Sequence, residues 1–233
     1  AKKIRQILAY LEAIHSQVRK YSRKRELVFI DGCAGNCHLS FLVYHYFTNI
    51  EQRPVRIHCV DYNSRLMAKN AERAKELGFE NMHFHGCDVG EFEHGGRVDA
   101  VYSLHACDDA TDKVMALAVN CGARNILSVS CCQHIIKKQI RTNPVTSPLS
   151  RHSVFKDKLA YMVGDSMRAL LLEMHGYEAD AIEFVTATAT EKNIMVRARV
   201  GQPKPRAVLV QDYEGLKASF RVTPALEELL GYR

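Results

Sequence analysis

The sequence predicts a single α/β domain in which a doubly wound, Rossmann-like and mostly parallel sheet follows an N-terminal helix. Short apolar runs alternate with stretches of helical period between residues 27 and 130, and this order builds a parallel sheet with right-handed crossovers. A turn of small residues, 31–37, directly follows the first apolar run. The last two apolar runs, 177–185 and 193–200, are joined by too few residues for a helical crossover, so we expect them to pair antiparallel.

The N-terminal helix is predicted over residues 3–20, because apolar side chains recur there at helical spacing. Residues 1–24 are therefore expected to form a basic amphipathic helix packed on the domain, and the domain itself to span residues 25–200. Residues 201–233 are expected to be a C-terminal tail, whose start is interrupted by two prolines and whose one short helix covers residues 224–230. The apolar positions of the first helix are Ile4, Ile7, Leu8, Leu11, Ile14 and Val18.

Within the domain, the predicted elements follow the alternation of strand and helix. A buried parallel strand is a short apolar run bounded by turn residues, whereas an amphipathic helix repeats its apolar positions about every 3.6 residues. Residues 139–154 contain two prolines among Ser, Thr and Asn, which predicts a long loop, and a helix with one apolar stripe is predicted over residues 155–174. The other predicted strands are 27–30, 55–60, 81–86, 98–104 and 125–130, and the other helices are 39–47, 65–77 and 111–120.

The formal net charge of +6 is concentrated in two stretches, residues 1–25 and residues 137–158. Two interpretations stay open from charge alone: the stretches bind an anionic partner, or they are solvated helix faces and loops. No apolar run approaches the ~20 residues that a membrane span needs, and the N-terminus lacks the apolar core of a secretory signal. We therefore expect a cytoplasmic protein without membrane contact.

All eight cysteines fall between Cys33 and Cys132, and no pair has the C-x-x-C spacing of zinc ribbons or thioredoxin-like sites. The chain shows neither the small size nor the signal of a secreted, disulfide-rich protein. We therefore expect the cysteines to be reduced and to serve mainly as small buried residues.

A candidate cofactor loop follows the first predicted strand. Ligands of a doubly wound sheet bind beyond the carboxyl ends of its strands, at the point where the strand order reverses. The loop has the length of a D-x-G-x-G-x-G turn but keeps only the middle glycine, and its small residues allow a ligand to approach the backbone closely. The candidate cofactor residues of this loop are Asp31, Gly32, Cys33, Ala34, Gly35 and Asn36.

Two further carboxylates follow the second and third predicted strands. Asp61 ends the second strand, where a carboxylate accepts hydrogen bonds from the two hydroxyls of a ribose; the alternative is a helix N-cap, which Asn63 can supply instead. Tyr62 and Asn63 extend this candidate cofactor site. Asp88, next to Val89, either holds the exocyclic amine of an adenine or is a turn aspartate. A nicotinamide dehydrogenase would place a carboxylate at the same point, but its G-x-G-x-x-G loop is absent.

A second group of candidate residues follows the fourth and fifth predicted strands, in the segments SLHACDD and SCCQH. The candidate catalytic residues are His105, Asp108, Cys132 and His134, which would shape a substrate pocket. His105 or Asp108 would act as a general base if the substrate must lose a proton, and His105 is also a candidate cofactor contact.

The same segments allow other interpretations. Thiolates and imidazoles would suit zinc, but adjacent cysteines on an extended segment point in opposite directions, so we expect no metal. Cys131 can equally serve only in packing. A covalent role for a cysteine has no support, because nothing in the sequence marks either thiol of SCCQH as activated.

The segments DGCAGNCHLS, VDYNSRLMAKN, SLHACDDATD, SVSCCQH and TEKN together resemble one family of class I S-adenosylmethionine-dependent methyltransferases. This family carries LHxC and CCxH motifs and includes a tRNA 2'-O-methyltransferase, and the resemblance spans about residues 25–200. It implies a seven-stranded sheet with an antiparallel last strand, S-adenosylmethionine in the crevice, and methyl transfer. Asp31, Gly35, Asp61 and Asp88 match the cofactor positions of the family.

The resemblance has two features that the family pattern does not explain. Cys33 and Cys37 stand where glycine is usual, and we expect their Cβ atoms to be tolerated if φ stays negative. Lys192 and Asn193 of TEKN match an element before the final strand to which we assign no role, and we likewise assign none to Cys131.

Three functions compete on this basis. The first is methylation of RNA, either tRNA or rRNA, in which basic residues of 1–25 and 137–158 contact phosphates. The second is methylation of a protein or a small molecule under a lid formed by residues 139–154; the absence of an Asp/Asn-Pro-Pro-Tyr segment gives methylation of a planar amine little support. The third is a non-catalytic RNA-binding module with a degenerate cofactor site, suggested by Cys33 and Cys37.

Overall fold

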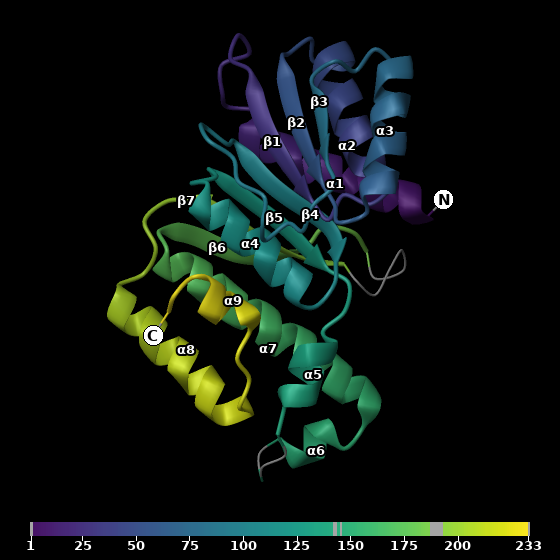
Figure 1. Cartoon of the computed structure of the whole chain (residues 1–233). Coiled ribbons are helices and arrows are strands. Elements are labelled where there is room, and N and C mark those ends of the chain that lie inside the picture. Colours follow the sequence, from purple (N-terminus) through teal and green to yellow (C-terminus); the bar gives the residue numbers. More distant parts are fainter. Residues whose placement is uncertain (1, 142–143, 145, 187–192, 233) are drawn as a thin grey trace.

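The fold is organised around one mixed sheet whose strands run in the order β3-β2-β1-β4-β5-β7-β6 (Figure 1). The computed structural model describes residues 2–141, 144, 146–186 and 193–232. β1 to β5 are parallel, and β7 lies antiparallel between β5 and β6, which confirms the predicted seven-stranded doubly wound sheet and its closing hairpin. The strands are β1 Leu27–Gly32, β2 Val55–Val60, β3 Met82–His85, β4 Ala100–Ala106, β5 Asn125–Ser130, β6 Tyr177–Glu183 and β7 Ile194–Val200.

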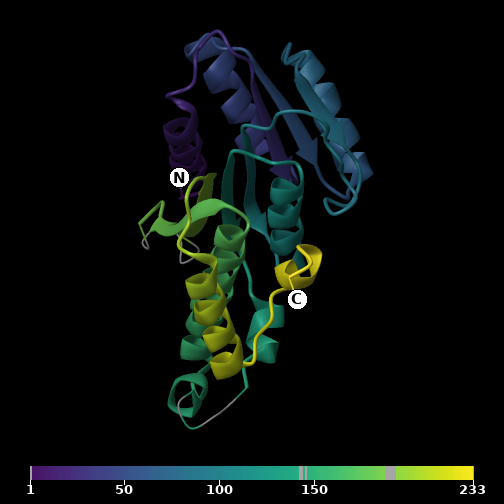
Figure 2. The same ribbon diagram turned by 90° about the vertical axis from the view of Figure 1, so that its left-hand side faces the viewer.

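Helices cover both faces of the sheet, as a doubly wound fold requires. Apolar side chains of α1, α2 and α3 pack on one face, and those of α4, α7, α8 and α9 pack on the other. α7 and α8 run side by side below the sheet in both views (Figures 1 and 2). The helices are α1 Lys2–Val18, α2 His38–His45, the π-helical turn η1 Tyr46–Ile50, α3 Ser64–Glu76, α4 Asp109–Asn120, α5 His134–Gln139, α6 Ser147–Ser150, α7 Ser153–Met174, α8 Arg206–Phe220 and α9 Ala225–Leu229.

The N-terminal helix is tied to the centre of the sheet. Leu11, Ile14 and Val18 are buried as predicted, but Ile4 and Leu8 are exposed and Tyr10 is buried in their place. The Tyr10 hydroxyl lies 2.8 Å from the carbonyl oxygen of Ser103 on β4 and 2.6 Å from that of Leu127 on β5. α1 is therefore a structural part of the domain and not a loosely attached basic segment.

The apolar stripe predicted for the helix after the long loop is only partly correct. Val163 and Met167 face the core, whereas Phe155 and Met162 are exposed. Asp165 and Arg168 take part of the inward face of α7 instead, and both are buried. This polar pair interrupts the apolar pattern because it serves the candidate site described below.

The C-terminal tail contains more helix than the sequence predicts. α9 forms where a short helix is expected, and α8 is an additional helix of 15 residues. Pro205 does not disrupt α8 but stands at its N-cap, where proline needs no intrahelical partner, and Leu209 and Tyr213 are buried against the core.

The long predicted loop, 139–154, is shorter in its described part. α5 ends at Gln139, the first residue of the predicted loop, α6 lies within the loop, and α7 begins at Ser153. Neither α5 nor α6 is predicted from the sequence. Part of the loop and Lys192 fall outside the described residues. No helix in the described part of the chain is long and apolar enough to cross a membrane.

Candidate active site

The strand order reverses between β1 and β4. From β1 the chain continues outward to β2 and β3, and β4 then pairs on the other side of β1. In such a sheet the carboxyl ends of the strands on both sides of the reversal open onto one crevice. The loops after β1, β2, β4 and β5 therefore share one edge of the sheet, and they carry nearly all the residues that the sequence singles out.

The loop after β1 is held by the neighbouring strand and helix. The backbone N–H of Gly35 donates to Asp61 Oδ2 at 2.9 Å, and the side-chain amide of Asn70 on α3 donates to the Gly35 carbonyl at 2.9 Å. Asp31 is only 3% exposed, and its carboxylate accepts a hydrogen bond of 2.6 Å from Ser40. Burial raises the pKa of Asp31 to about 7. Asp31 thus supports the loop from below, while Asn36 at its tip is exposed.

Cys33 and Cys37 adopt positive φ values of 61° and 53°, so the expectation of negative φ at these positions is wrong. The left-handed region favours glycine because a Cβ crowds the following carbonyl, at a cost of roughly 1–2 kcal/mol per residue. The loop keeps the path that glycines usually permit, and the cysteines bear the strain. The Cys37 thiol donates to the Gly35 carbonyl at 3.6 Å and accepts from Asn70 at 3.3 Å, which partly offsets that strain.

Gly32 has a packing role that is independent of any ligand. A Cβ at this position would lie 2.6 Å from a methyl carbon of Val114 on α4, so only glycine lets α4 approach the end of β1. Gly35 differs, because its φ is +52° and a Cβ there would meet nothing within 4 Å. Open space therefore lies above the loop at Gly35, where a ligand would bind.

Asp61 does not cap α3. Its Oδ1 accepts the backbone N–H of Asn63 at 3.0 Å, and the Asn63 side chain itself caps α3 by accepting from Leu66 N at 3.0 Å. The cap therefore comes from Asn63, as the sequence suggested. An ionised carboxylate has about four lone-pair positions, so the two bonds that Asp61 makes leave capacity for ribose hydroxyls. Tyr62 stands beside it with 81% of its surface exposed.

Asp88 lies farther along the same edge and is engaged by protein groups. Its Oδ2 pairs with Lys113 of α4 at 2.8 Å and its Oδ1 accepts the N–H of Gly90 at 2.8 Å. The hydrogen bond from Lys113 is the largest cause of the lowered pKa of Asp88. Val89 is buried in the core, so only its backbone can meet a ligand. Contact of Asp88 with an adenine amine stays a prediction.

The end of β4 and the loop that follows it have an unusual backbone at two candidate residues. His105 has φ +72° and Asp108 has φ +48°, and the pairing of β4 with β5 is irregular around His105. Non-glycine residues in this region concentrate at functional sites, where surrounding contacts hold them. Asp108 Oδ1 accepts the backbone N–H of Ile135 at 3.0 Å, so the carboxylate also holds the start of α5.

α1 contributes a residue that the sequence analysis missed. The Oε1 atom of Gln6 lies 3.0 Å from Nε2 of His105, which orients the His105 ring toward α1. Gln6 is 6% exposed, and its Nε2 atom is buried without a hydrogen-bond partner among the described residues. No local sequence signal marks Gln6, because its role depends on His105, which is 99 residues away in sequence.

The candidate catalytic residues converge only in part. Cys132 Sγ lies 3.8 Å from Asp108 Oδ2, so these two residues meet across the loops after β4 and β5. His134 is exposed as the first residue of α5, and His105 points toward α1. The four candidates lie at one edge of the sheet, and the structure brings Asp108 and Cys132 together but not the two histidines.

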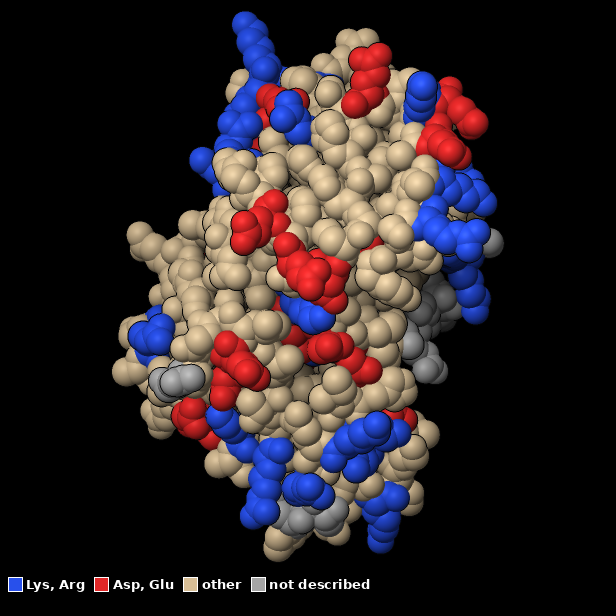
Figure 3. Space-filling view, in the orientation of Figure 1, with Lys and Arg blue, Asp and Glu red and all other residues tan. Residues whose placement is uncertain are grey.

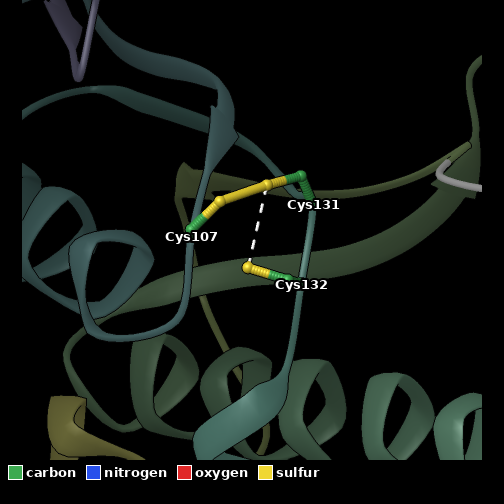
Figure 4. A group of neighbouring side chains, drawn as sticks. All are labelled: Cys107, Cys131 and Cys132. Carbon is green, nitrogen blue, oxygen red and sulfur yellow. Dashed lines mark hydrogen bonds between the residues drawn. A yellow bond between two sulfur atoms is a disulfide. The ribbon is translucent and has the colours of Figure 1, made fainter.

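Cys107 and Cys131 are joined by a disulfide, so the expectation that all the cysteines are reduced is wrong for this pair (Figure 4). Neighbouring strands bring the two residues together, with their Cα atoms 5.5 Å apart although 24 residues separate them in sequence. The argument that Cys131 and Cys132 point apart is also wrong. β5 ends at Ser130, and the chain then turns, so the two Sγ atoms lie 3.8 Å apart.

A buried ionic network lies directly behind these two loops and was not predicted. Arg168 of α7 makes a bidentate pair with Asp112 of α4, at 2.8 and 2.9 Å, and donates to Gln133 of the SCCQH segment at 2.8 Å. It also pairs with Asp165 at 3.1 Å. Burial alone would lower the pKa of Arg168, but the carboxylates of Asp112 and Asp165 raise it. The network fixes the LHACDDATD and CCQH segments relative to each other.

The strand order and the crevice at the strand reversal define a Rossmann-like domain. Residues 2–139 match the model of a family described as "Methyltransferase domain", and the chain belongs to that family. No curated protein matches the chain.

Solved structures with similar folds include the following three. The 23S rRNA methyltransferase ErmE is 10% identical, with a TM-score of 0.50 over 88% of this chain and 75% of its own. The CMeT domain of the citrinin polyketide synthase is 11% identical, with a TM-score of 0.55 over 85% and 53%. The Burkholderia thailandensis 1,6-didemethyltoxoflavin-N1-methyltransferase, solved with its substrate and S-adenosylhomocysteine, is 14% identical, with a TM-score of 0.50 over 84% and 78%. At these identities the likeness shows the fold.

Proposed function

We propose that this protein is an S-adenosylmethionine-dependent methyltransferase that acts on RNA. The observation that carries the proposal is the Asp61 carboxylate, which holds the Gly35 loop and retains capacity for ribose hydroxyls beside the exposed ring of Tyr62. The open space above Gly35 accommodates the part of the cofactor that approaches the loop. The bound cofactor would supply an electrophilic methyl group.

The residues present fit this cofactor in a definite arrangement. Asp61 would accept the ribose hydroxyls, Tyr62 would cover the adenine, and the backbone near Asp88 and Val89 would contact the adenine edge. The loop of residues 31–36 would contact the methionine part through backbone groups. On the acceptor side, Asp108 would take the proton from a hydroxyl acceptor.

Basic residues lie on both sides of the acceptor end. Lys2, Lys3 and Arg5 are exposed at the start of α1, which reaches the crevice through the contact of Gln6 with His105. The other basic segment follows Cys132 directly, and Figure 3 shows Lys and Arg gathered at the lower end of the molecule, over α5 and α6. Side chains in these positions would contact the phosphates of an RNA whose reactive nucleotide enters the crevice.

The structure separates the basic residues of 1–25 into two groups. Lys2, Lys3 and Arg5 flank the crevice, whereas Arg19 and Lys20 follow the other end of α1, a helix of 17 residues. The second group lines a cavity of about 1030 Å³ with Arg124 and Arg199, near the ends of β5 and β7 that lie away from the crevice. We therefore assign RNA contact to the residues at the crevice edge.

The acceptor class is tested by transferring labelled methyl groups into separate RNA, protein and small-molecule fractions. We expect label in RNA, and label found only in another fraction would contradict the RNA proposal. The variant Lys138→Ala/Lys158→Ala removes a cation from two exposed positions. We expect the slope of the logarithm of the RNA-binding constant against the logarithm of the salt concentration to become shallower by about one unit per lysine. The matched control Arg19→Ala/Lys20→Ala removes the same charge at the far end of α1 and should leave the slope unchanged.

Cofactor binding is tested by calorimetry with S-adenosylhomocysteine. Asp61→Ala should weaken binding by at least about tenfold, because hydrogen bonds to a charged group contribute roughly 1.5–3 kcal/mol. Asp180→Ala removes an exposed carboxylate from β6 and should not change the affinity. Absence of binding to the unaltered protein would favour a non-catalytic RNA-binding module, and circular dichroism would verify that each variant is folded.

A further inference from the structure

We propose that the thiolates of Cys107, Cys131 and Cys132 form a site for one soft divalent metal ion, and we expect this ion to be zinc. Among the described residues, the three Sγ atoms form one group whose members all lie within 4.8 Å of one another (Figure 4). The two loops that supply them follow the adjacent strands β4 and β5. This site goes beyond methyl transfer and does not depend on the identity of the methyl acceptor.

The spacing of the sulfur atoms fits tetrahedral coordination. Zinc binds cysteine sulfur at about 2.3 Å, so two ligands of a tetrahedral site lie roughly 3.8 Å apart. The Sγ atoms of Cys131 and Cys132 already have this separation, 3.8 Å. A third sulfur from Cys107 lies within the same group, which gives three soft ligands on one side of a possible ion.

Asp108 is the candidate for the fourth position, and in the metal-bound state it would not be available as the general base proposed above. Its Oδ2 lies 3.8 Å from Cys132 Sγ, close to the roughly 3.5 Å edge expected between sulfur and oxygen ligands of zinc. Its Oδ1 is held by the N–H of Ile135, which orients the carboxylate toward the cysteines. The Tyr161 hydroxyl donates to the carbonyl of Cys131 at 2.7 Å and fixes the turn that carries two of the ligands.

The surroundings of these cysteines differ from those of cysteines that only pack. Cys37 and Cys59 are buried in the core, whereas Cys107 is exposed and Cys131 and Cys132 are half-buried. An ion can therefore reach the three sulfur atoms from solvent.

The disulfide and the metal site exclude each other. A metal needs the sulfur atoms of Cys107 and Cys131 as thiolates, so the disulfide must first be reduced. A dithiol reductant gives it two electrons and two protons and itself becomes a disulfide. The metal then displaces the protons of the three thiols. The cluster thus has two states, and the metal-bound state exists only in the reduced protein.

The test uses the full chain, reduced without oxygen and titrated with Co²⁺, whose spectrum reports coordination. We expect one equivalent of Co²⁺ to produce a thiolate-to-cobalt charge-transfer band and the ligand-field bands of a tetrahedral site, and Zn²⁺ to remove both. The variant Cys132→Ser should lose the tetrahedral spectrum. The matched control Cys121→Ser changes a half-buried cysteine at the end of α4, outside the cluster, and should keep it.

A second readout guards against a variant that folds poorly. In the unaltered reduced protein, Zn²⁺ should protect Cys107, Cys131 and Cys132 from alkylation, as located by mass spectrometry, and should leave Cys121 as reactive as before. The proposal is overturned if the reduced protein binds no stoichiometric Co²⁺, if Cys132→Ser keeps the full spectrum, or if Zn²⁺ protects none of the three. None of these results would bear on binding of S-adenosylhomocysteine, so failure of the metal site and failure of the methyltransferase proposal are distinguishable.

Discussion

Asp61 supports the loop after β1 from the end of the neighbouring strand β2. Its carboxylate accepts the backbone N–H of Gly35 at 2.9 Å and that of Asn63 at 3.0 Å, which leaves lone pairs for the ribose hydroxyls of the proposed cofactor. The loop needs this support because Cys33 and Cys37 keep it in a left-handed conformation that costs free energy. Cys33 and Cys37 therefore leave the backbone path of the loop as glycines would have it, and they add conformational strain.

The strain at Cys33 leads to a prediction about stability. Replacement by alanine keeps a Cβ at φ +61°, whereas replacement by glycine removes it. The free energy of unfolding of Cys33→Gly should therefore be larger than that of Cys33→Ala by about 1 kcal/mol. Both variants lose the same thiol. In the unaltered protein this thiol stays protonated, because burial and then the charge of Asp61 raise its pKa to about 12. Urea unfolding followed by circular dichroism measures the difference. Equal stabilities would show that the positive φ at Cys33 carries no strain.

The role of a residue could be predicted where a local sequence pattern determines it. It could not be predicted where it depends on residues that are distant in the sequence. Asn63 could be predicted as the cap of α3 because an N-cap residue before a helix is a local signal. The role of Gln6 depends on His105, which is 99 residues away in sequence. The positive φ of Cys33 likewise follows from how the loop is held and not from its own residue type.

At the scale of elements, α7 connects the two loops of the acceptor side. Its residue Arg168 is 1% exposed and joins Asp112 of α4 to Gln133 after β5. Gly164, one turn earlier, leaves room for Gln133, whose Oε1 would lie 3.2 Å from a Cβ at that position. α7 thus sets the relative position of the LHACDDATD and CCQH segments. A sequence that predicts only an apolar stripe for this helix misses the connection.

Arg168→Met tests this role of α7. It leaves Asp112 and Asp165 as buried charges without their partner, and breaking a buried ion pair in this way costs about 3–5 kcal/mol. Chemical unfolding should therefore show a large loss of stability. The control Arg197→Met breaks an exposed pair with Asp180 between β7 and β6 and should cost less than about 1 kcal/mol. Similar losses in both variants would contradict a special role for the buried network.

At the scale of the whole molecule, the order of elements was predictable and the covering of the sheet was less so. The strands β2 and β5 match their predicted bounds because each is a short apolar run between turn residues. α8 was missed because the prolines before it were taken as the interruption of a tail, although Pro205 marks a helix start. The disulfide between Cys107 and Cys131 was unpredictable because it depends on the adjacency of β4 and β5.

The outer edge of the sheet carries a cluster of histidines that should make stability depend on pH. His58 of β2 lies with Nδ1 3.1 Å from Nε2 of His85 on β3, and its ring is near those of His83 and His94. Burial first, and then the neighbouring histidines, lower the pKa of His58 to about 3. Burial also lowers the pKa values of His83, His85 and His94. His58 is therefore neutral in the folded protein near pH 6.

The sign follows from the protons bound in each state. An unfolded histidine takes up a proton near pH 6.5, whereas folded His58 does so only near pH 3, so the unfolded state binds more protons as the pH falls between these values. Stability from His58 is complete above about pH 6.5 and is lost below it. Asp31 acts in the opposite direction, because its raised pKa of about 7 makes the folded state bind the extra proton in the same range. The pH dependence of the unaltered protein alone therefore mixes the two groups.

A comparison between variants separates the two effects. His58→Gln removes a group that destabilises the fold as the pH falls, so lowering the pH from 7 to 5 should change its melting temperature in a more favourable direction than in the unaltered protein. Asp31→Asn removes the opposing group, so the same pH change should affect its melting temperature less favourably than in the unaltered protein. Differential scanning calorimetry at both pH values gives the change within each protein, which cancels any loss of stability common to both conditions. If the change in His58→Gln equals that in the unaltered protein, His58 does not resist protonation in the folded state.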